Sequence, residues 1–142
     1  MRRLLCAVAI AALFVVSGAF ERAKAEVTVQ IDRAAQTMTV VVDGFPRYTW
    51  PISSGRPGLG TPAGTFHPHS LARSWFSSKY HNSPMPHSIF FRGGIAIHGT
   101  YETAYLGRAV SHGCVRLDPA NATALFGLVR EQGMGATTIV VH

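Results

Sequence analysis

The alternation of apolar and polar residues divides most of this chain into short extended segments. Residues 27–31 and 38–42 each alternate with a period of two, and the polar stretch 32–36 between them predicts an antiparallel hairpin. The same reasoning predicts further extended segments at residues 47–53, 65–70, 88–91, 95–98 and 137–141. We therefore expect about eight short strands in total.

One helix and two irregular regions complete the pattern. Asp118 is a suitable N-cap, Pro119 suits the first turn, and residues 120–130 have helical periodicity. The expected apolar side of this helix consists of Leu125, Leu128 and Val129, and its expected end is Gly133 or Gly135. Glycine and proline make residues 54–64 a loop, and residues 71–88 have no clear period. A mainly β sandwich or barrel-like core with long loops follows.

The first 25 residues read as a secretory signal peptide. Arg2 and Arg3 precede an apolar run at residues 4–16, and Ala23-Lys24-Ala25 has the form of a cleavage site. The run is shorter than the roughly 20 residues of a membrane span, so no stable span is expected after cleavage. An uncleaved anchor is the alternative. We expect export to the periplasm or an equivalent extracytoplasmic envelope.

Residues 26–142 have the length of one domain. The whole chain carries a net charge of +6, but the leader holds four basic residues and one acidic residue. The remaining nine basic and six acidic residues give +3, with no block of like charge. Nucleic-acid binding is therefore not expected, whereas a mild positive charge suits a substrate with free carboxylates.

Cys114 is the one thiol that remains once Cys6 leaves with the leader. An exported protein is expected to pair its cysteines, so a lone thiol is buried and inert, intermolecularly paired, or reactive. The segment Ser111-His112-Gly113-Cys114 and a second histidine, His98, at the end of a predicted strand favour reactivity. Only the thiolate attacks well, and a nearby imidazole can take the proton and stabilise it as an ion pair.

The neighbours of the two residues suggest supporting roles. A backbone carbonyl at Gly99 could accept one ring N–H of His98 and fix its tautomer. Gly113 can adopt backbone angles that aim its own N–H and that of Cys114 at an oxyanion. Arg116 would lie on the same side of an extended segment as Cys114, where it could hold a substrate carboxylate or brace the loop.

The remaining polar residues near the thiol leave alternatives open. Ser111 and His112 suit structural roles in the tight turn, although both remain site candidates. A zinc site built from His98, His112 and Cys114 is the main rival, and His67 and His69 could add to it. No HExxH or CxxC spacing supports that rival, and no metal is expected.

The segments that contain His98 and Cys114 resemble those of a known family. His98-Gly99-Thr100 followed by Ser111-His112-Gly113-Cys114-Val115-Arg116-Leu117 is similar to the signature of the L,D-transpeptidases, the YkuD-type catalytic domain of bacterial cell-wall enzymes. Residues 54–56 and 60–66 resemble a second segment of that family. The resemblance implies a mixed-sheet β-sandwich with one or two short helices over residues 26–142.

The resemblance also implies a reaction. Cys114 would be the acylated nucleophile, His98 its base and Gly99 the carbonyl that orients the base, with His112 and Gly113 shaping the oxyanion pocket. Ser111, Thr100 and Arg116 would bind substrate, although some members have Asn at the position of Arg116. No cofactor is implied, and carbapenems would inhibit.

The implied partners are peptidoglycan stem peptides. The thiolate would attack the L,D bond between diaminopimelate and the terminal D-alanine of a tetrapeptide stem. The acyl group would pass to the side-chain amine of a second stem or to a lysine of an envelope protein. Two alternatives remain: an L,D-carboxypeptidase using the same thiol, and a non-catalytic envelope protein that binds zinc or peptidoglycan.

Overall fold

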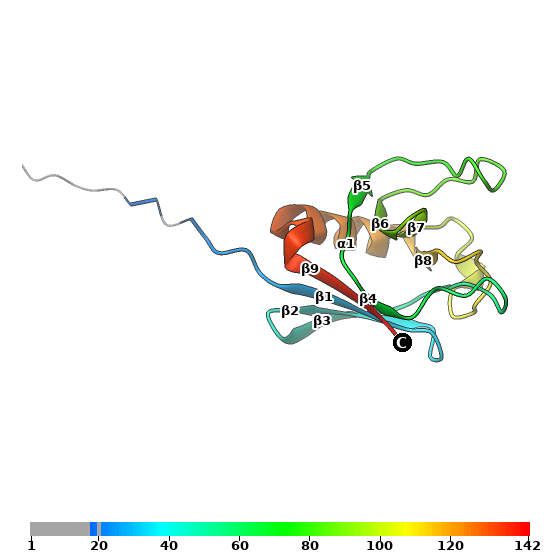
Figure 1. Cartoon of the computed structure of the whole chain (residues 1–142), viewed down its shortest axis with the longest axis horizontal. Helices are drawn as coiled ribbons and strands as arrows, with labels where there is room; N and C mark the ends of the chain where they lie inside the picture. Colours follow the sequence, from blue (N-terminus) through cyan, green and yellow to red (C-terminus); the bar gives the residue numbers. More distant parts are fainter. Residues whose placement is uncertain (1–17, 20) are drawn as a thin grey trace, which may run out of the picture.

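The structure, a computed structural model, describes residues 18–19 and 21–142. The apolar run at residues 4–16 lies outside the described residues, so the signal peptide remains a prediction. No helix among the described residues is long and apolar enough to cross a membrane. Two mixed sheets form the molecule, and one helix lies beside them (Figure 1).

The first sheet has the strand order β3-β2-β1-β9-β4. Its strands are β1 (Val27–Asp32), β2 (Thr37–Val42), β3 (Phe45–Pro51), β4 (Gly64–Phe66) and β9 (Thr137–Val141). The predicted hairpin is confirmed, since β1 and β2 pair antiparallel with Val29 opposite Val40. The last strand, β9, lies parallel to β1, with Ile139 opposite Val29. The two ends of the domain are therefore joined at the centre of this sheet.

The second sheet has the order β5-β6-β7-β8. Its strands are β5 (Ser70–Ala72), β6 (Ser88–Arg92), β7 (Ile95–Gly99) and β8 (Val115–Leu117). The segment predicted as extended at residues 65–70 is divided, because β4 joins the first sheet and β5 begins the second. β8 was not among the extended segments predicted from periodicity. It runs parallel to β7, with Ile97 opposite Val115.

The predicted helix is confirmed as α1 (Pro119–Gln132), and two short 3₁₀ helices cover η1 (Thr103–Tyr105) and η2 (Met134–Ala136). The Asp118 carboxylate accepts the Ala120 N–H at 2.9 Å, which satisfies one free donor of the first turn. At the other end the Gly133 N–H donates to the Val129 carbonyl, and Gly133 has a φ of 99°, which suits glycine.

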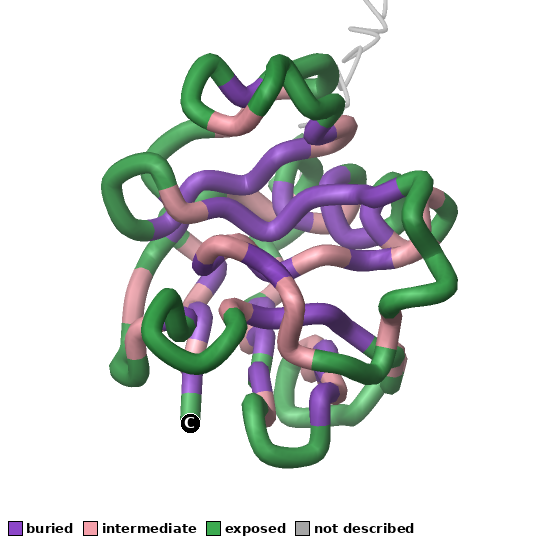
Figure 2. The backbone as a smooth tube through the Cα atoms, turned by 90° about the vertical axis from the view of Figure 1, so that its right-hand side faces the viewer, coloured by how far each residue is buried: buried purple, intermediate pink, exposed green. Residues whose placement is uncertain are grey.

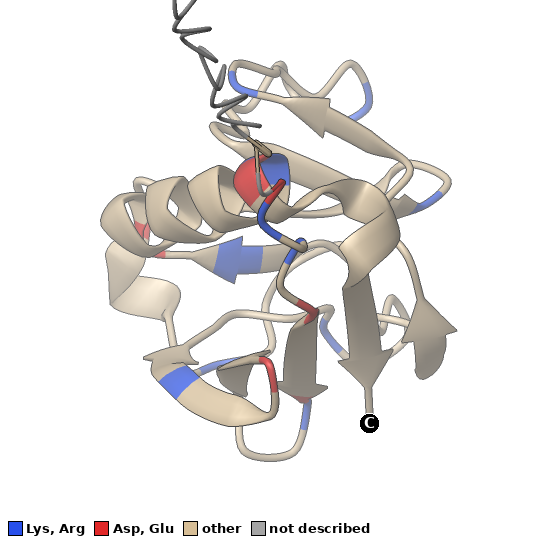
Figure 3. Cartoon of the chain, turned by 90° about the vertical axis from the view of Figure 1, so that its left-hand side faces the viewer, with Lys and Arg blue, Asp and Glu red and all other residues tan. Residues whose placement is uncertain are grey.

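A single core joins both sheets and the helix (Figure 2). Val29 and Ile139 contribute from the first sheet, Ile97 and Val115 from the second, and Leu125 from α1, all at most 1% exposed. Because successive strand residues face opposite sides, burying Ile97 and Val115 turns Ala96, His98, Cys114 and Arg116 toward the outer face of the second sheet. That face carries the candidate site. On the face shown in Figure 3, acidic and basic residues are scattered.

Candidate active site

The nucleophile candidate, Cys114, directly precedes β8 and lies next to β7. Its sulfur accepts the Ala96 N–H at 3.5 Å and is 3.9 Å from the Gly94 carbonyl oxygen. The side chain packs against a small apolar cluster of Met85, Phe90 and Ala96. Burial raises the pKa of the Cys114 thiol, while the Ala96 hydrogen bond and the charge of Arg116 lower it. The thiol is therefore protonated at rest.

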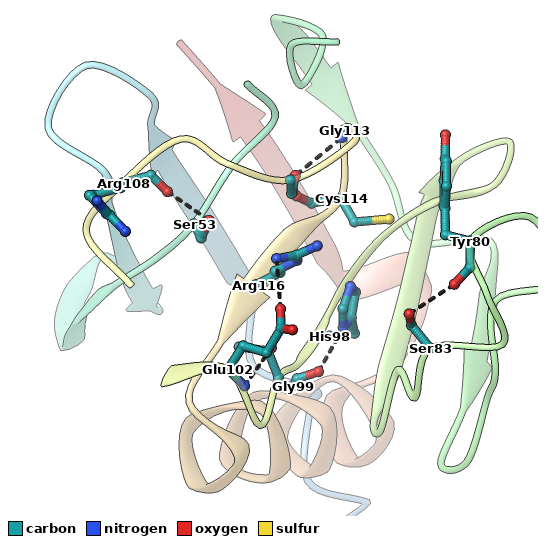
Figure 4. Close-up of polar contacts among 12 residues, drawn as sticks. Ser53, Tyr80, Ser83, His98, Gly99, Glu102, Arg108, Gly113, Cys114 and Arg116 are labelled. Atoms are coloured by element: carbon teal, nitrogen blue, oxygen red, sulfur yellow. Dashed lines mark hydrogen bonds and ion pairs between the residues drawn. The ribbon is translucent and has the colours of Figure 1, made fainter. Parts of the chain in front are cut away.

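His98 lies on β7, on the same face of the sheet as Cys114, and is 5% exposed. Its Nδ1 is 2.7 Å from the Gly99 carbonyl oxygen, and because a carbonyl can only accept, Nδ1 carries the proton. Nε2 is left as the acceptor of this neutral tautomer. In Figure 4 the edge of the ring bonded to Gly99 faces away from the sulfur.

Burial lowers the pKa of His98 to about 4; the Gly99 hydrogen bond raises it and the charge of Arg116 lowers it further. A neutral imidazole therefore faces a neutral thiol at pH 7, in contrast to the ion pair expected from the sequence. The imidazole has its free nitrogen available to take the thiol proton as the sulfur attacks.

The Ser111 side chain stabilises the turn before Cys114. The Ser111 hydroxyl donates to the Cys114 carbonyl and accepts the Gly113 N–H at 3.1 Å. Gly113 has a φ of 129°, a conformation that L side chains rarely adopt. The Gly113 amide, expected to face an oxyanion, is thus engaged by Ser111 in this structure. Among the described residues no hydrogen bond from the Cys114 N–H to another protein group is formed, so this N–H is free to donate to a ligand.

A second loop supports the first, and sequence reasoning did not single out its central residue. The hydroxyl of Thr61, 1% exposed, donates to the Gly113 carbonyl at 2.7 Å and accepts the Gly55 N–H at 3.0 Å. A Cβ on Gly55 would lie 2.1 Å from the Leu59 carbonyl oxygen, so this close turn requires glycine. The available signal was the Gly60–Phe66 segment, which resembles the family pattern.

Both candidate catalytic side chains line one cavity of about 490 Å³. Ser111, His112, Thr100 and Arg116 also line it, so it collects all the candidate side chains. Tyr80 and Met85 come from the irregular segment before β6. The Tyr80 ring stacks on His112 with centroids 4.2 Å apart. The pKa of His112 is lowered by desolvation and then by nearby positive charges, chiefly Arg56 and Arg116.

Arg116 pairs with an acidic residue that sequence reasoning missed. Its Nη1 lies 3.5 Å from Oε2 of Glu102 (Figure 4). The Glu102 N–H donates to the Thr100 hydroxyl at 3.1 Å, which ties this turn to the end of β7. The signal available in the sequence was one acidic residue two positions after Thr100, the last residue of the HGT motif, which is too weak to single out Glu102.

His98, His112 and Cys114, the ligands of the rival zinc site, line the same cavity but are not arranged as metal ligands. Among residues 18–19 and 21–142 no group of three His, Cys, Asp or Glu side chains is arranged to hold a metal ion. His67 lies elsewhere, with Nδ1 2.9 Å from the Thr137 carbonyl oxygen.

Comparison with known proteins identifies the family and supports the fold. A family model for the L,D-transpeptidase catalytic domain, YkuD, matches residues 26–141. The chain belongs to this family. An L,D-transpeptidase 1 of Mycobacterium tuberculosis is 32% identical over 110 residues, covering 68% of this chain and 44% of its own length. The chain thus spans less than half of that curated relative.

Solved structures of L,D-transpeptidases agree with this assignment. An L,D-transpeptidase from Mycobacterium smegmatis superposes with a TM-score of 0.74 at 27% identity, covering 83% of this chain and 59% of the other. The LD transpeptidase LdtMt1, solved in complex with imipenem, has the same TM-score at 26% identity and the same coverage. The expected mainly β fold with mixed sheets is therefore confirmed for this L,D-transpeptidase domain.

Proposed function

We propose that this chain is an extracytoplasmic cysteine acyltransferase acting on peptidoglycan tetrapeptide stems. The observation that carries the proposal is the shared outer face of β7 and β8, where His98 and Cys114 line one cavity with the free nitrogen of a fixed imidazole tautomer available. We further propose that residues 1–25 are a cleaved signal peptide and that residues 26–142 are the catalytic domain, working in the periplasm or an equivalent envelope compartment.

The first half-reaction forms a thioester. The Cys114 sulfur attacks the carbonyl carbon between diaminopimelate and the terminal D-alanine, while His98 Nε2 takes the thiol proton. The Cys114 N–H faces the developing oxyanion, and release of the Gly113 N–H from Ser111 would add a second donor. The carbon–nitrogen bond breaks, and D-alanine leaves with the proton returned by the imidazolium.

The second half-reaction reverses these roles. An acceptor amine attacks the thioester carbonyl, His98 takes a proton from that amine, and the Cys114 thiol is restored as the carbon–sulfur bond breaks. The proposed acceptors are the side-chain amine of a second stem and the lysine amine of an envelope protein. Every step uses groups of the chain itself, so the proposal needs no cofactor.

Intact mass of the purified protein before and after imipenem tests the nucleophile. We expect the mass of one imipenem molecule to add to the wild type and no adduct on Cys114→Ala. His98→Ala should slow adduct formation about 10²- to 10⁴-fold, the usual range for loss of a general base. His67→Ala is the matched control, because His67 also bonds a carbonyl through Nδ1 but lies outside the cavity.

An adduct on Cys114→Ala, or a wild-type rate for His98→Ala, would refute the assigned roles. The reaction itself is tested by incubating the protein with a disaccharide-tetrapeptide and measuring the products by mass spectrometry. Dimers linked through two diaminopimelates indicate transfer, whereas tripeptide alone indicates an L,D-carboxypeptidase. The unprocessed or shortened mass of the exported protein tests cleavage after Ala25.

A further inference from the structure

The cavity contains one acidic and one strongly basic side chain among the described residues that line it, and the two are paired. Arg116 supplies the guanidinium and Glu102 the carboxylate, 3.5 Å apart. The side chain of Arg116 is 20% exposed and that of Glu102 is 65% exposed. A partly buried guanidinium is thus paired with a carboxylate that is largely exposed to water.

The backbone of Arg116 is paired with neighbouring segments, so its side chain is the part that can change partner. The Arg116 N–H donates to the Ser53 carbonyl at 2.9 Å, and the Ser53 N–H donates back at 3.1 Å. Arg116 is also opposite His98 in the parallel β7–β8 register. Its side chain lines the same cavity as His98 and Cys114 (Figure 4), and its charge lowers the pKa of both groups.

The contact with Glu102 is a weak one. It is a single contact of 3.5 Å with a well-exposed carboxylate, the kind of pair that contributes little to stability. A ligand carboxylate that binds the guanidinium through two hydrogen bonds would be favoured over it. Such a ligand would displace Glu102 from the guanidinium.

The proposed reaction presents such a carboxylate twice. The leaving D-alanine carries its carboxylate on the carbon next to the amine, and so does the D-configured centre of diaminopimelate whose amine would be the acceptor. A lysine side chain has no carboxylate near its amine. One positive group beside the thioester would therefore serve the leaving and the incoming amino acid alike.

We propose that Arg116 binds the carboxylate adjacent to the leaving and attacking amines, and that Glu102 is a positioning residue which holds Arg116 until that carboxylate displaces it. This inference rests on the proposed function. It selects a second peptidoglycan stem over a protein lysine as acyl acceptor. In transfer, the amine nitrogen bonds to the thioester carbon, its proton passes to His98, and the sulfur leaves and is reprotonated, while the carboxylate on Arg116 stays ionised.

The test compares acceptors with and without a carboxylate next to the amine, and D-methionine and its amide are the matched pair. The purified protein is supplied with disaccharide-tetrapeptide and with D-methionine, D-methioninamide or Nα-acetyl-lysine methylamide, and products are measured by mass. We expect kcat/KM for D-methionine to exceed that for both other acceptors by about tenfold or more, because only it offers a carboxylate to the guanidinium. Equal use of D-methionine and its amide would overturn the inference.

Variants of Arg116 and Glu102 distinguish the roles of the two residues. Arg116→Gln should bring the acid-to-amide ratio close to one. Glu102→Gln should lower KM for D-methionine several-fold with little change in kcat, and should leave the amide unaffected, because the internal competitor is removed. Glu131→Gln on α1, outside the cavity, is the matched control. A preference that persists in Arg116→Gln, or an unchanged KM in Glu102→Gln, would contradict the assignment.

A second experiment applies the same test to the case in which the protein hydrolyses its substrate. Donor stems ending in D-alanine or D-alaninamide are compared by the rate of tripeptide release, and the same Arg116-dependent preference is expected. The imipenem adduct on Cys114 is measured in parallel. Absence of that adduct refutes the proposed function, whereas an adduct without any acid preference in either arm refutes this inference alone.

Discussion

At the scale of single residues, burial decides the chemistry of the site. His98 is 5% exposed and its one ring donor is satisfied by the Gly99 carbonyl, so a second proton would be carried in a poorly solvated place. The same burial disfavours the thiolate of Cys114. Burial therefore favours the neutral form of both groups, and in the proposed mechanism proton transfer accompanies attack.

Acidification should cost stability through His98. Its pKa of about 4 in the folded protein lies below the ordinary value of 6.5, so the unfolded chain takes up the proton first. Above pH 6.5 the group has no effect, and between pH 6.5 and 4 the folded state loses about 3 kcal/mol, a loss complete below pH 4. Urea unfolding across pH 4–7.5 measures this loss of stability.

The matched variant for this prediction is His98→Gln. It should remove this part of the pH dependence, while His67→Gln should retain it. An identical pH dependence in wild type and His98→Gln would show that His98 is not held neutral by burial.

At the scale of elements, two loops far apart in the sequence support each other. Residues 54–64 contact the turn before Cys114 through the Arg56 N–H, which donates to the Ser111 carbonyl, and the Ser111 N–H, which donates to the Ser54 carbonyl. The buried Thr61 hydroxyl adds the bond to the Gly113 carbonyl. The orientation of the Gly113 peptide, and with it the Cys114 N–H, therefore depends on a loop more than 50 residues earlier.

Thr61→Val tests this support, because it keeps the shape of the side chain and removes the hydroxyl. Leaving the Gly55 N–H and the Gly113 carbonyl without their partner should cost about 1–3 kcal/mol. The rate of imipenem acylation should fall as well, since the oxyanion donor is less well oriented. Thermal unfolding and adduct kinetics measure the two effects.

Thr65→Val is the control for that variant, since Thr65 is an exposed threonine on β4. It should leave both the unfolding temperature and the acylation rate near wild type. If Thr61→Val behaved like Thr65→Val, the two loops would not be coupled as described.

At the scale of the whole molecule, the site depends on a core that spans both sheets. Leu125 of α1 is fully buried in the cluster that contains Ile97 and Val115, the inward neighbours of His98 and Cys114. α1 also crowds the end of β7, where a Cβ on Gly99 would lie 3.3 Å from Ala122 Cβ. The helix thus supports the strand that carries His98, the proposed base.

Leu125→Ala should destabilise the domain by about 2–5 kcal/mol, the usual cost of such a cavity. Urea unfolding followed by circular dichroism and by tryptophan fluorescence measures the loss, and the two probes should coincide if the core is one unit. Leu59→Ala is the control, because Leu59 is 40% exposed and should change stability by less than about 0.5 kcal/mol. Separate transitions for the two probes would contradict a single core.

Local signals in the sequence were sufficient for the elements that depend on neighbouring residues. The period-2 segments predicted the β1–β2 hairpin, Asp118 and Pro119 predicted the start of α1, and its end lies at Gly133, one of the two glycines expected there. The HGT and SHGC segments predicted the two side chains now seen to share a cavity. These features depend on backbone propensity, capping and residue chemistry over a few positions, so the chain alone determines them.

Only the tertiary structure decided the features that join distant segments. The parallel β1–β9 and β7–β8 pairings have no local signal, because the pairing energy comes from strands separated along the chain. The Glu102–Arg116 contact and the Thr61 hydroxyl bond also depend on the fold, because each joins separate segments of the chain. The lowered pKa of His98 does too, since desolvation depends on everything packed around the ring. The residue types came from the sequence, and their protonation and partners came from the fold.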